Sequence, residues 1–350
     1  MTNLKPNQDR ILIILVNYNG AADTLECIES LKYISHSNFQ ILVVDNASSD
    51  DSMPVLLNRF RRQTVVELPA YLTTTLNCRK AHNLEPVFVS ESALLDESVD
   101  TFCDYPLIIC NSRKNRGFAG GNNIGLKYAI KDGDFDYIWM LNNDTITHPD
   151  ALTNMLHRVR ENNGRVTCGS MVLHYHQPDV VQALGGGKFN RWTGISSTSF
   201  GRGLYDQHAT DFRGYEKRLS YISGCSWLLP MSFINDIGLM DEDYFLYYGE
   251  IDWCERAKNQ YGLVFAEAAK VWHKDGTSIG PPSYRQKSSL FSDYFIFKNK
   301  LRLVRRFNPV ALPIAWGVSL LQSVNRIRRG EWDKARLILE ICFGIAKPVR

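Results

Sequence analysis

The stretch ILIILVNYNG, residues 11–20, decides the fold. Residues 11–16 are apolar without interruption, which is typical of a strand buried on both faces, and the NYNG that follows indicates a turn. Residues 21–34 space their apolar side chains along one helical face, so a helix is expected there. ILVVD at 41–45 repeats the strand pattern before a helix predicted over 53–60. Two successive strand–helix units predict a parallel sheet with right-handed crossovers.

The strand–helix alternation stops and then resumes. Residues 63–105 show no sustained period, and we interpret them as an insertion of unassigned fold. Strands are predicted again at 106–110 and 137–141, each followed by a helix. Beyond residue 165, short strands and frequent glycines predict a mixed sheet with a loop-rich stretch at about 188–217. The fold class expected is therefore α/β, with a Rossmann-like half and a mixed-sheet half.

Composition narrows the classes of function. The 350 residues are 44% hydrophobic and 22% charged, which excludes disorder, collagen and coiled coil for the chain as a whole. A net charge of +3 is small for a nucleic-acid binder, so no nucleic-acid partner is expected. The eight cysteines lack the spacing of a zinc site, which favours reduced thiols in the cytoplasm. The first residues lack the long apolar segment of a signal peptide.

The C-terminal end differs from the rest of the chain in charge. Residues 298–350 contain 12 basic and three acidic residues, a balance of +9, which leaves −6 for residues 1–297. Helices are predicted over 292–306 and 309–346, and the second combines apolar spacing with arginines, as an interfacial amphipathic helix does. A membrane surface is the partner expected for this tail. Packing on the body or on a second copy in a homodimer remains an equal alternative from the periodicity.

Polar residues follow the predicted strands. Asp45, the glycine-rich segment 111–125 and Asp144 all come directly after a strand, and ligands of open α/β sheets bind beyond those carboxyl ends. Asp45 suits a ribose hydroxyl or a base N–H, although a local cap is the structural alternative. Asp144 suits a hard cation such as Mg²⁺ or Mn²⁺, or else a solvated turn. The segment 111–125 is not a clean dinucleotide fingerprint.

A later segment, residues 241–257, is rich in acids and aromatics. Glu250, among tyrosines at the start of a predicted short helix, is a candidate general base, although acids are common in a first helical turn. His273 is a candidate ligand, although a lone histidine is more often structural.

The order and spacing of these motifs are more specific than any one of them. They are V-N-Y-N at 16–19, V-D-N-A-S-S-D at 44–50, N-x-G-F-A-G-G-N-N at 115–123, L-N-N-D at 141–144, S-G-C at 223–225, D-E-D-Y-F-x-Y-Y-x-E-x-D-W-C-x-R at 241–256 and H-K at 273–274. From about residue 11 to 278, outside the two insertions, this string resembles glycosyltransferase family 2, and within it the bacterial rhamnosyltransferase-like branch.

The resemblance implies a GT-A fold over residues 1–290, followed by a basic helical tail over 291–350. It also implies a nucleotide-sugar donor, a divalent metal, Mg²⁺ or Mn²⁺, and inversion at the anomeric carbon. The positions that match the family's nucleotide side are Asn17, Tyr18, Asp45, Asn115, Gly117, Asn122, Asn123 and Asn143. Asp144 and His273 match metal positions, with Asn142 where many relatives have Asp. Asp252 and Trp253 are expected on the acceptor side.

The resemblance also implies the catalytic base. That base is the second residue of an acidic pair in the family, and here the pair reads Gly249-Glu250, so Glu250 is the candidate. Gly249 departs from the usual acid, which keeps open a non-catalytic nucleotide-sugar or glycan-binding protein. A Rossmann-type oxidoreductase is disfavoured, because the glycine-rich turn follows the third strand and not the first.

The function expected from the sequence is transfer of a sugar, such as rhamnose, from a dTDP- or UDP-linked donor. The acceptor is expected to be a glycan or a lipid-linked glycan in cell-surface polysaccharide synthesis. A lipid-linked acceptor accounts for a basic tail, because polybasic segments gain roughly 1 kcal/mol per Lys or Arg at an anionic leaflet. The expected location is the cytoplasm, peripheral on the inner face of the cell membrane.

Overall fold

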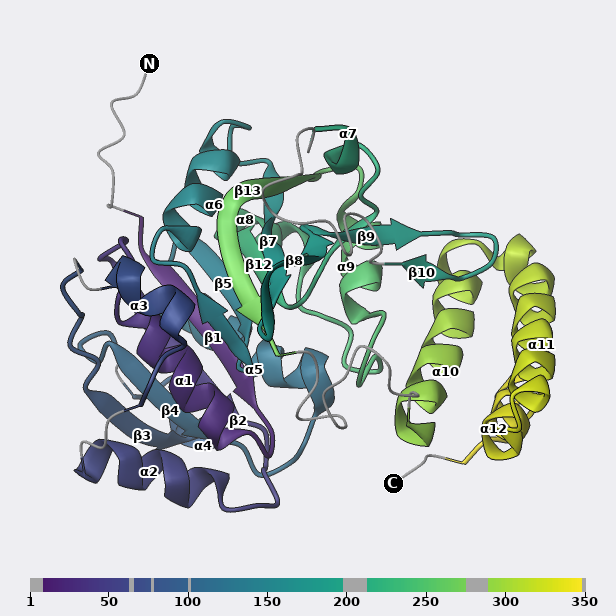
Figure 1. The fold of residues 1–350 in the computed structure, drawn as a ribbon, viewed down its shortest axis with the longest axis horizontal. Coiled ribbons are helices and arrows are strands. Elements are labelled where there is room, and N and C mark those ends of the chain that lie inside the picture. The colour runs from purple at the N-terminus through teal and green to yellow at the C-terminus, as the bar shows by residue number, and fades with distance from the viewer. Residues whose placement is uncertain are drawn as a thin grey trace.

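The computed structural model describes residues 9–62, 66–76, 79–99, 102–197, 213–274 and 289–347. Within these residues a ten-stranded sheet runs in the order β3-β4-β2-β1-β5-β12-β7-β13-β6, with β8 paired to β7 (Figure 1). A small sheet of order β10-β9-β11 lies beside it. The chain is therefore an α/β protein with a mixed sheet, as the sequence predicts.

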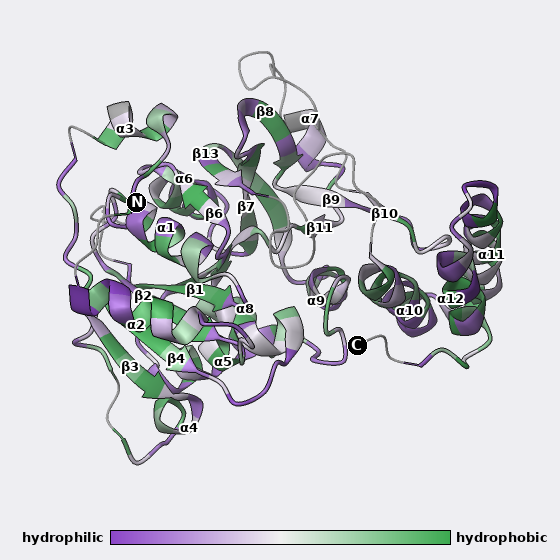
Figure 2. Cartoon of the chain, turned by 60° about the horizontal axis from the view of Figure 1, so that its bottom comes forward, coloured by the Kyte–Doolittle hydropathy of each residue, from purple (hydrophilic) through white to green (hydrophobic). Residues whose placement is uncertain are grey.

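The parallel half of the sheet forms where the apolar runs predict it. Its strands are β1 (Ile11–Asn17), β2 (Phe39–Asp45), β4 (Leu107–Asn111) and β5 (Tyr137–Asn142). β1 pairs in parallel with both β2 and β5, which puts the carboxyl ends of all three strands at one edge. Figure 2 shows the hydrophobic colour concentrated on these central strands. The predicted parallel sheet is confirmed.

Helices cover both faces of this half. The helices on one face are α1 (Ala21–Leu31), α2 (Ser52–Arg62) and α6 (Ala151–Arg160), which pack against the odd-numbered side chains of β1. The helices on the other face are α5 (Gly117–Asp132), α8 (Met231–Ile237) and α9 (Gly249–Ala257), which pack against the even-numbered ones. Alternation along one strand therefore supplies two separate cores.

The glycine-rich segment is the start of α5 and not a turn before it. The sequence places this helix from about residue 122, whereas it begins at Gly117. A Cβ on Gly121 would lie 2.7 Å from Val16 Cγ1, and one on Gly125 would lie 2.7 Å from Ile14 Cδ1. These two glycines let the helix backbone approach β1 closely, which is a packing role.

The second half mixes strand directions, as predicted. Its strands are β6 (Thr145–Thr147), β7 (Val166–His174), β8 (Gln177–Leu184), β9 (Gly186–Phe189), β10 (Ser196–Ser197), β11 (Tyr221–Ile222), β12 (Ser226–Pro230) and β13 (Gly262–His273). The expectation of short strands fails for β7 and β13. β13 extends over 12 residues, and a bulge between Ala266 and Lys270 lets its pairing with β7 continue.

The predicted insertion belongs to the main sheet. Its described parts include α3 (Ala70–Leu76), β3 (Pro86–Ser90) and α4 (Glu91–Leu94), and β3 pairs in parallel with β4 as an edge strand. In the loop-rich stretch, residues 198–212 lie outside the described residues, and α7 (Arg213–Glu216) follows them.

The tail consists of α10 (Leu290–Phe307), a 3₁₀ turn η2 (Pro309–Ala311), α11 (Leu312–Arg328) and α12 (Trp332–Cys342). The expectation of one helix over 309–346 is wrong, because Gly330, with φ +71°, turns the chain back between two antiparallel helices. Figure 1 shows α10 between this hairpin and the body. Among the described helices, none is long and apolar enough to cross a bilayer.

Candidate active site

Polar side chains at the carboxyl ends of β1, β2 and β5 form one hydrogen-bonded chain. Asn17, fully buried, donates from Nδ2 to Asp45 Oδ1 at 2.7 Å and accepts at Oδ1 from Asn143 Nδ2 at 3.4 Å. Asp45, 1% exposed, also accepts from Ser48 Oγ at 2.6 Å. Half-buried Tyr18 follows at the same edge. The structure thus brings together four residues predicted for the nucleotide side, and it holds Asp45 in local hydrogen bonds.

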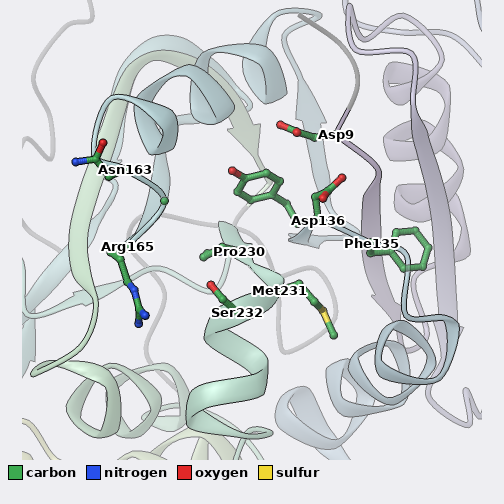
Figure 3. Close-up of a pocket in the computed structure, with 10 residues that line it drawn as sticks. Asp9, Phe135, Asp136, Asn163, Arg165, Pro230, Met231 and Ser232 are labelled. Atoms are coloured by element: carbon green, nitrogen blue, oxygen red, sulfur yellow. The ribbon is translucent and has the colours of Figure 1, made fainter. Parts of the chain in front are cut away.

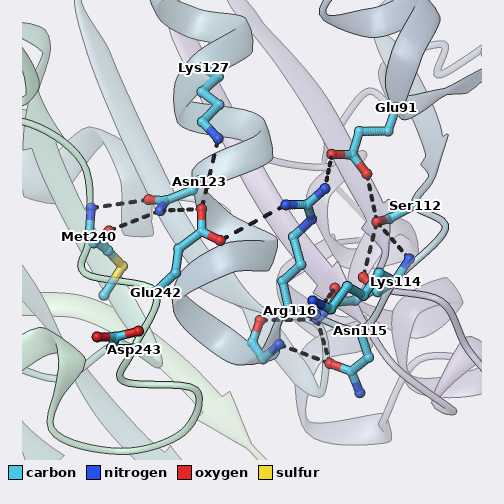
Figure 4. A network of polar contacts seen from close by, with 12 residues as sticks. Glu91, Ser112, Lys114, Asn115, Arg116, Asn123, Lys127, Met240, Glu242 and Asp243 are labelled. Atoms are coloured by element: carbon cyan, nitrogen blue, oxygen red, sulfur yellow. Dashed lines mark hydrogen bonds and ion pairs between the residues drawn. The ribbon is translucent and has the colours of Figure 1, made fainter.

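The remaining predicted nucleotide-side residues brace loops. Asn123 donates to the carbonyl of Met240 at 2.9 Å and accepts from its N–H at 3.0 Å, which ties α5 to the acidic segment (Figure 4). Asn115 Oδ1 accepts from the N–H of Gly117 at 2.9 Å. Asn122 donates to the carbonyl of the preceding helical turn. Each of these three asparagines therefore has at least one polar atom bonded to the protein's own backbone in this structure.

Asp144 and His273 face each other where β6 begins and β13 ends. His273 Nε2 lies 3.2 Å from Asp144 Oδ1, and His273 Nδ1 lies 2.9 Å from Gln182 Oε1. Burial disfavours the imidazolium, but Asp144 and Cys225 together outweigh it and raise the pKa of His273 well above its usual value. In the neutral ring, an N–H at Nδ1 held by Gln182 leaves Nε2 as an acceptor aimed at Asp144.

This pair fits a divalent cation. A carboxylate oxygen and an imidazole nitrogen converge on one point, and Gln182 orients the ring as an outer-shell partner does in metal sites. The nitrogen donor favours Mn²⁺ over Mg²⁺, which prefers oxygen ligands and keeps several waters. No cluster of three or more His, Cys, Asp and Glu occurs among the described residues, so this pair would share a cation with oxygens of a bound ligand.

Glu250, in the first turn of α9, lines a cavity of 310 Å³. The cavity is walled by Tyr221 of β11, by Tyr247 and Tyr248, and by α10. Burial raises the pKa of the Glu250 carboxyl, and no side chain among the described residues hydrogen-bonds to it or forms an ion pair with it. A raised pKa makes this carboxylate a stronger proton acceptor than an ordinary glutamate, which suits a general base.

A strained turn sets the direction of α9. Tyr247 and Tyr248 both have positive φ, 61° and 68°, which costs an aromatic residue on the order of 1 kcal/mol each. Asn299 of α10 donates to the carbonyls of Leu246 and Tyr247 at 2.8 and 3.1 Å. Tyr248 donates from its hydroxyl to the carbonyl of Gly194 at 2.9 Å. The tail and the loop between β9 and β10 thus hold the turn that presents Glu250.

The cavity and the Asp144–His273 pair are joined by a short segment. Tyr221 lines the cavity with Glu250, and four residues later Cys225 contacts His273. The backbone N–H of Asn142, at the end of β5, donates to the carbonyl of Cys225 at 2.9 Å. A candidate base and a candidate cation site therefore flank one stretch of backbone at the carboxyl edge of the sheet.

A model of glycosyl transferase family 2 matches residues 12–69 and 64–182. The fold and the strand-end residues agree with that match. The chain belongs to this family.

Among its relatives, the chain is 22% identical over 217 residues to the low-salt glycan biosynthesis hexosyltransferase Agl10 of Haloferax volcanii, covering 61% of this chain and 66% of that protein. It is 27% identical over 157 residues to an uncharacterized glycosyltransferase of Rickettsia conorii, covering 45% of this chain and 18% of that protein. The alignments therefore span about two thirds of the first relative and less than a fifth of the second.

Solved structures share the fold. GalNAc-T7, crystallised with UDP, GalNAc and Mn²⁺, matches with a TM-score of 0.55 at 13% identity, covering 86% of this chain and 48% of that one. Residues 1–349 of S. aureus TarS match with a TM-score of 0.50 at 11% identity, covering 96% and 83%. These likenesses place the chain among GT-A glycosyltransferase folds.

Two residues expected on the acceptor side of this family 2 fold are buried elsewhere. Trp253 is 0% exposed, packs edge-to-face on Trp227 and donates to the carbonyl of Gly238 at 2.9 Å. Asp252, also 0% exposed, is held by Arg256 at 3.0 Å and Arg306 at 2.7 Å. The expectation is corrected, because both side chains point into the core face of α9 while Glu250 points into the cavity.

Sequence reasoning missed three residues of the site. Gln182 and Cys225 both contact His273. No local pattern marks Gln182, and Cys225 belongs to the S-G-C motif at 223–225, to which the sequence assigned no role. Asn299, 0% exposed, lies in the tail beyond the resemblance. An asparagine on the apolar side of a predicted helix is the signal that might have marked it, because a buried amide needs partners.

A second hollow lies at the opposite edge of the sheet (Figure 3). It has a volume of 420 Å³ and is lined by residues that include Asp9, Asp136, Arg165 and Ser232. These positions adjoin the amino ends of β1 and β5, whereas ligands of open α/β sheets bind at the carboxyl ends. No predicted site residue lines it.

Proposed function

We propose that the chain is an inverting, metal-dependent glycosyltransferase that transfers a sugar from a nucleotide-diphosphate donor to an acceptor hydroxyl. The observation that carries the proposal is Glu250. Among the described residues no side chain pairs with this carboxylate, burial raises its pKa, and it lines a cavity whose Tyr221 lies four residues before Cys225, a contact of His273. Membership of glycosyltransferase family 2 supports the same reaction class.

The residues divide the reaction between them. Glu250 accepts the proton of an acceptor hydroxyl that lies in the cavity, and the oxygen attacks the anomeric carbon from the side opposite the departing diphosphate. One displacement without a covalent intermediate inverts the configuration. Asp144 and His273 would hold the divalent cation, which would supply positive charge to stabilise the leaving diphosphate.

The donor in this proposal is dTDP- or UDP-linked, and rhamnose is the sugar implied by the resemblance. GalNAc-T7 was crystallised with UDP and Mn²⁺, and TarS with UDP-GlcNAc, which supports a nucleotide-sugar for this fold. Asn17, Tyr18 and Asp45 stand at the strand edge where the base and ribose would lie.

The acceptor in this proposal is a glycan or lipid-linked glycan at the cytoplasmic face of the cell membrane. The hairpin of α11 and α12 supports it, because one stripe of each helix is exposed and apolar and exposed Arg305, Arg328 and Arg329 carry positive charge nearby. The exposed apolar residues here are Val310, Ile314, Leu321, Val324, Trp332, Leu339, Phe343 and Ile345. Anionic lipid would complement both features.

Donor binding and turnover test the reaction. Stabilisation of the wild type against heat by UDP, dTDP and their sugars is measured with and without Mn²⁺, followed by release of the nucleotide from a donor that binds. Glu250→Gln is expected to keep metal-dependent donor binding and to lose turnover at least 100-fold, and Glu267→Gln, an exposed carboxylate, serves as the control. Asp144→Ala is expected to abolish the effect of Mn²⁺ on donor binding.

Two outcomes would count against the proposal. Full turnover by Glu250→Gln would contradict the assignment of the base, and donor binding without turnover in the wild type would favour the non-catalytic alternative.

Vesicle binding tests the location. The wild type is expected to sediment with phosphatidylglycerol vesicles, and Leu321→Glu with Trp332→Glu is expected to reduce sedimentation at least tenfold, with Val55→Glu as an exposed control elsewhere. A stable dimer in light scattering that the same double variant dissociates, without lipid binding by the wild type, would assign this face to a second copy instead.

A further inference from the structure

The tail places a buried lysine in the cavity that contains Glu250. Lys300 of α10 is 2% exposed, and it lines the 310 Å³ cavity together with Gln322 of α11. Its Nζ donates to Gln322 Oε1 at 2.7 Å and lies 4.6 Å from the centre of the Phe297 ring. An ammonium group has three hydrogen-bond donors, so two of them find no acceptor among the described residues.

Lys300 differs from Arg302 and Arg306, two other cations of α10. Arg302 lies 2.7 Å from the carboxylate of Asp243, and Arg306 lies 2.7 Å from that of Asp252. No carboxylate of the described residues forms an ion pair with Lys300, and it is the most buried of the three. Buried lysines are normally paired, because burying a charge without a counter-charge is unfavourable by several kcal/mol. Among the described residues, Lys300 is therefore a cation of the cavity without a paired anion.

The protonation state of Lys300 agrees with this interpretation. Burial lowers the pKa of its amine to about 8, so the group is still mostly charged at pH 7. The groups that act on it, the Gln322 amide oxygen, the Phe297 ring and the Cys342 thiol of α12, favour the charged amine but do not offset its burial.

We propose that the cavity is the acceptor site and that Lys300 binds an anionic group, phosphate or carboxylate, carried by the acceptor sugar whose hydroxyl faces Glu250. This inference rests on the proposed role of Glu250 as the base. It names the acceptor's chemical class, an anionic glycan, which the family motifs do not specify. Lysine acts on such groups as a point charge and requires no bidentate geometry.

The walls and the size of the cavity fit one such sugar. Tyr221, Tyr247 and Phe297 present aromatic surface, on which sugar rings pack. A volume of 310 Å³ is at the lower end of small-molecule sites, which span roughly 300–1,000 Å³. This volume suits a single charged sugar better than a nucleotide-sugar, whose place is at the strand ends.

Binding of small probes tests the proposal without requiring transfer. Glucose 1-phosphate, glucuronate and neutral methyl glucoside are titrated into the wild type, Lys300→Met and Lys298→Met, and binding is followed by calorimetry. Lys298 is an exposed lysine of the same helix, which makes it a matched control. We expect at least one anionic sugar to bind the wild type and Lys298→Met ten times more tightly than methyl glucoside does. Lys300→Met is expected to lose that preference.

The outcomes of this titration distinguish a phosphate from a carboxylate as the anion. They also distinguish failure of the anion-site proposal from failure of the transferase proposal. Preference for glucose 1-phosphate indicates a phosphorylated acceptor, and preference for glucuronate indicates a uronic acid. Equal binding of charged and neutral sugars, or an unchanged preference in Lys300→Met, would overturn the anion site. Lys300→Gln repeats the test if Lys300→Met does not fold. Metal-dependent donor binding, measured on the same proteins, reports on the transferase proposal alone, so failure of one is distinguishable from failure of the other.

Discussion

Replacing Lys300 with Met is expected to stabilise the protein at neutral pH. The lowering of the Lys300 pKa from 10.5 to about 8 means that the fold disfavours the charged amine by roughly 3 kcal/mol. Met fills a similar volume and needs no counter-charge. Loss of the hydrogen bond to Gln322 offsets part of this gain by about 1–2 kcal/mol, because it leaves an amide oxygen without its donor. The net expectation is a gain of about 1–2 kcal/mol in the free energy of unfolding at pH 7.

The stability difference between Lys300→Met and the wild type should change with pH in a defined direction. Because the folded pKa of Lys300 lies below the unfolded one, the unfolded chain binds more protons between pH 8 and 10.5, and the stability of the wild type rises with pH across that window. Lys300→Met lacks this rise, so its advantage should shrink as pH increases from 7 to 9.5. Urea unfolding followed by tryptophan fluorescence measures both proteins, with Lys298→Met as control. A variant that is less stable at pH 7, by the same amount at both pH values, would refute the reasoning.

Four further perturbations follow from the site. Asn299→Ala removes both donors that hold the turn before α9, so kcat is expected to fall at least tenfold in single-turnover kinetics while donor affinity is unchanged. Arg306→Ala leaves buried Asp252 with one guanidinium partner, which should lower the free energy of unfolding by about 2 kcal/mol in urea titrations. Gly249→Ala meets neighbours no closer than 3.4 Å and should raise stability by about 0.5 kcal/mol in thermal melts. Because burial raises the pKa of Glu250, kcat measured from pH 5 to 8 should fall with acid at a pH above the ordinary 4.5 of glutamate.

The strands were predictable because their signal is local. Apolar runs such as 11–16 and 41–45 require burial on both faces wherever the chain places them, and β1 and β2 formed there. The glycine-rich segment was not predictable in the same way. Only glycine fits at positions 121 and 125, because Val16 and Ile14, more than a hundred residues away in the sequence, leave no room for a Cβ. The sequence shows where the glycines are, but it does not show which residues pack against them.

A site residue was harder to predict from the sequence the more its position depends on partners far away along the chain. Asp144 and His273 meet because β6 and β13 pair, and the spacing of the motifs anticipates that pairing. Glu250 and Asp252 are two residues apart on one short helix, and the sequence does not show which of them faces the cavity. Arg306, from the tail, draws Asp252 toward the core side. Asp252 was therefore misassigned to the acceptor side because its ion-pair partner, Arg306, lies 54 positions away in the sequence.

The tail explains why family motifs describe the donor side better than the acceptor side. The motif string ends near residue 278, yet Asn299 holds the turn before Glu250 and Lys300 with Gln322 closes the cavity. The side chains that a helix turns toward a cavity must suit the ligand as well as the core. A helix that only binds a membrane surface lacks the first of these constraints. Substitutions at inward positions of α10 should therefore change which acceptor is used, whereas substitutions on the outward stripe of α11 should change where the protein resides. The two sets of positions are separable by mutation, because Lys300 is 2% exposed whereas Leu321 is 67% exposed.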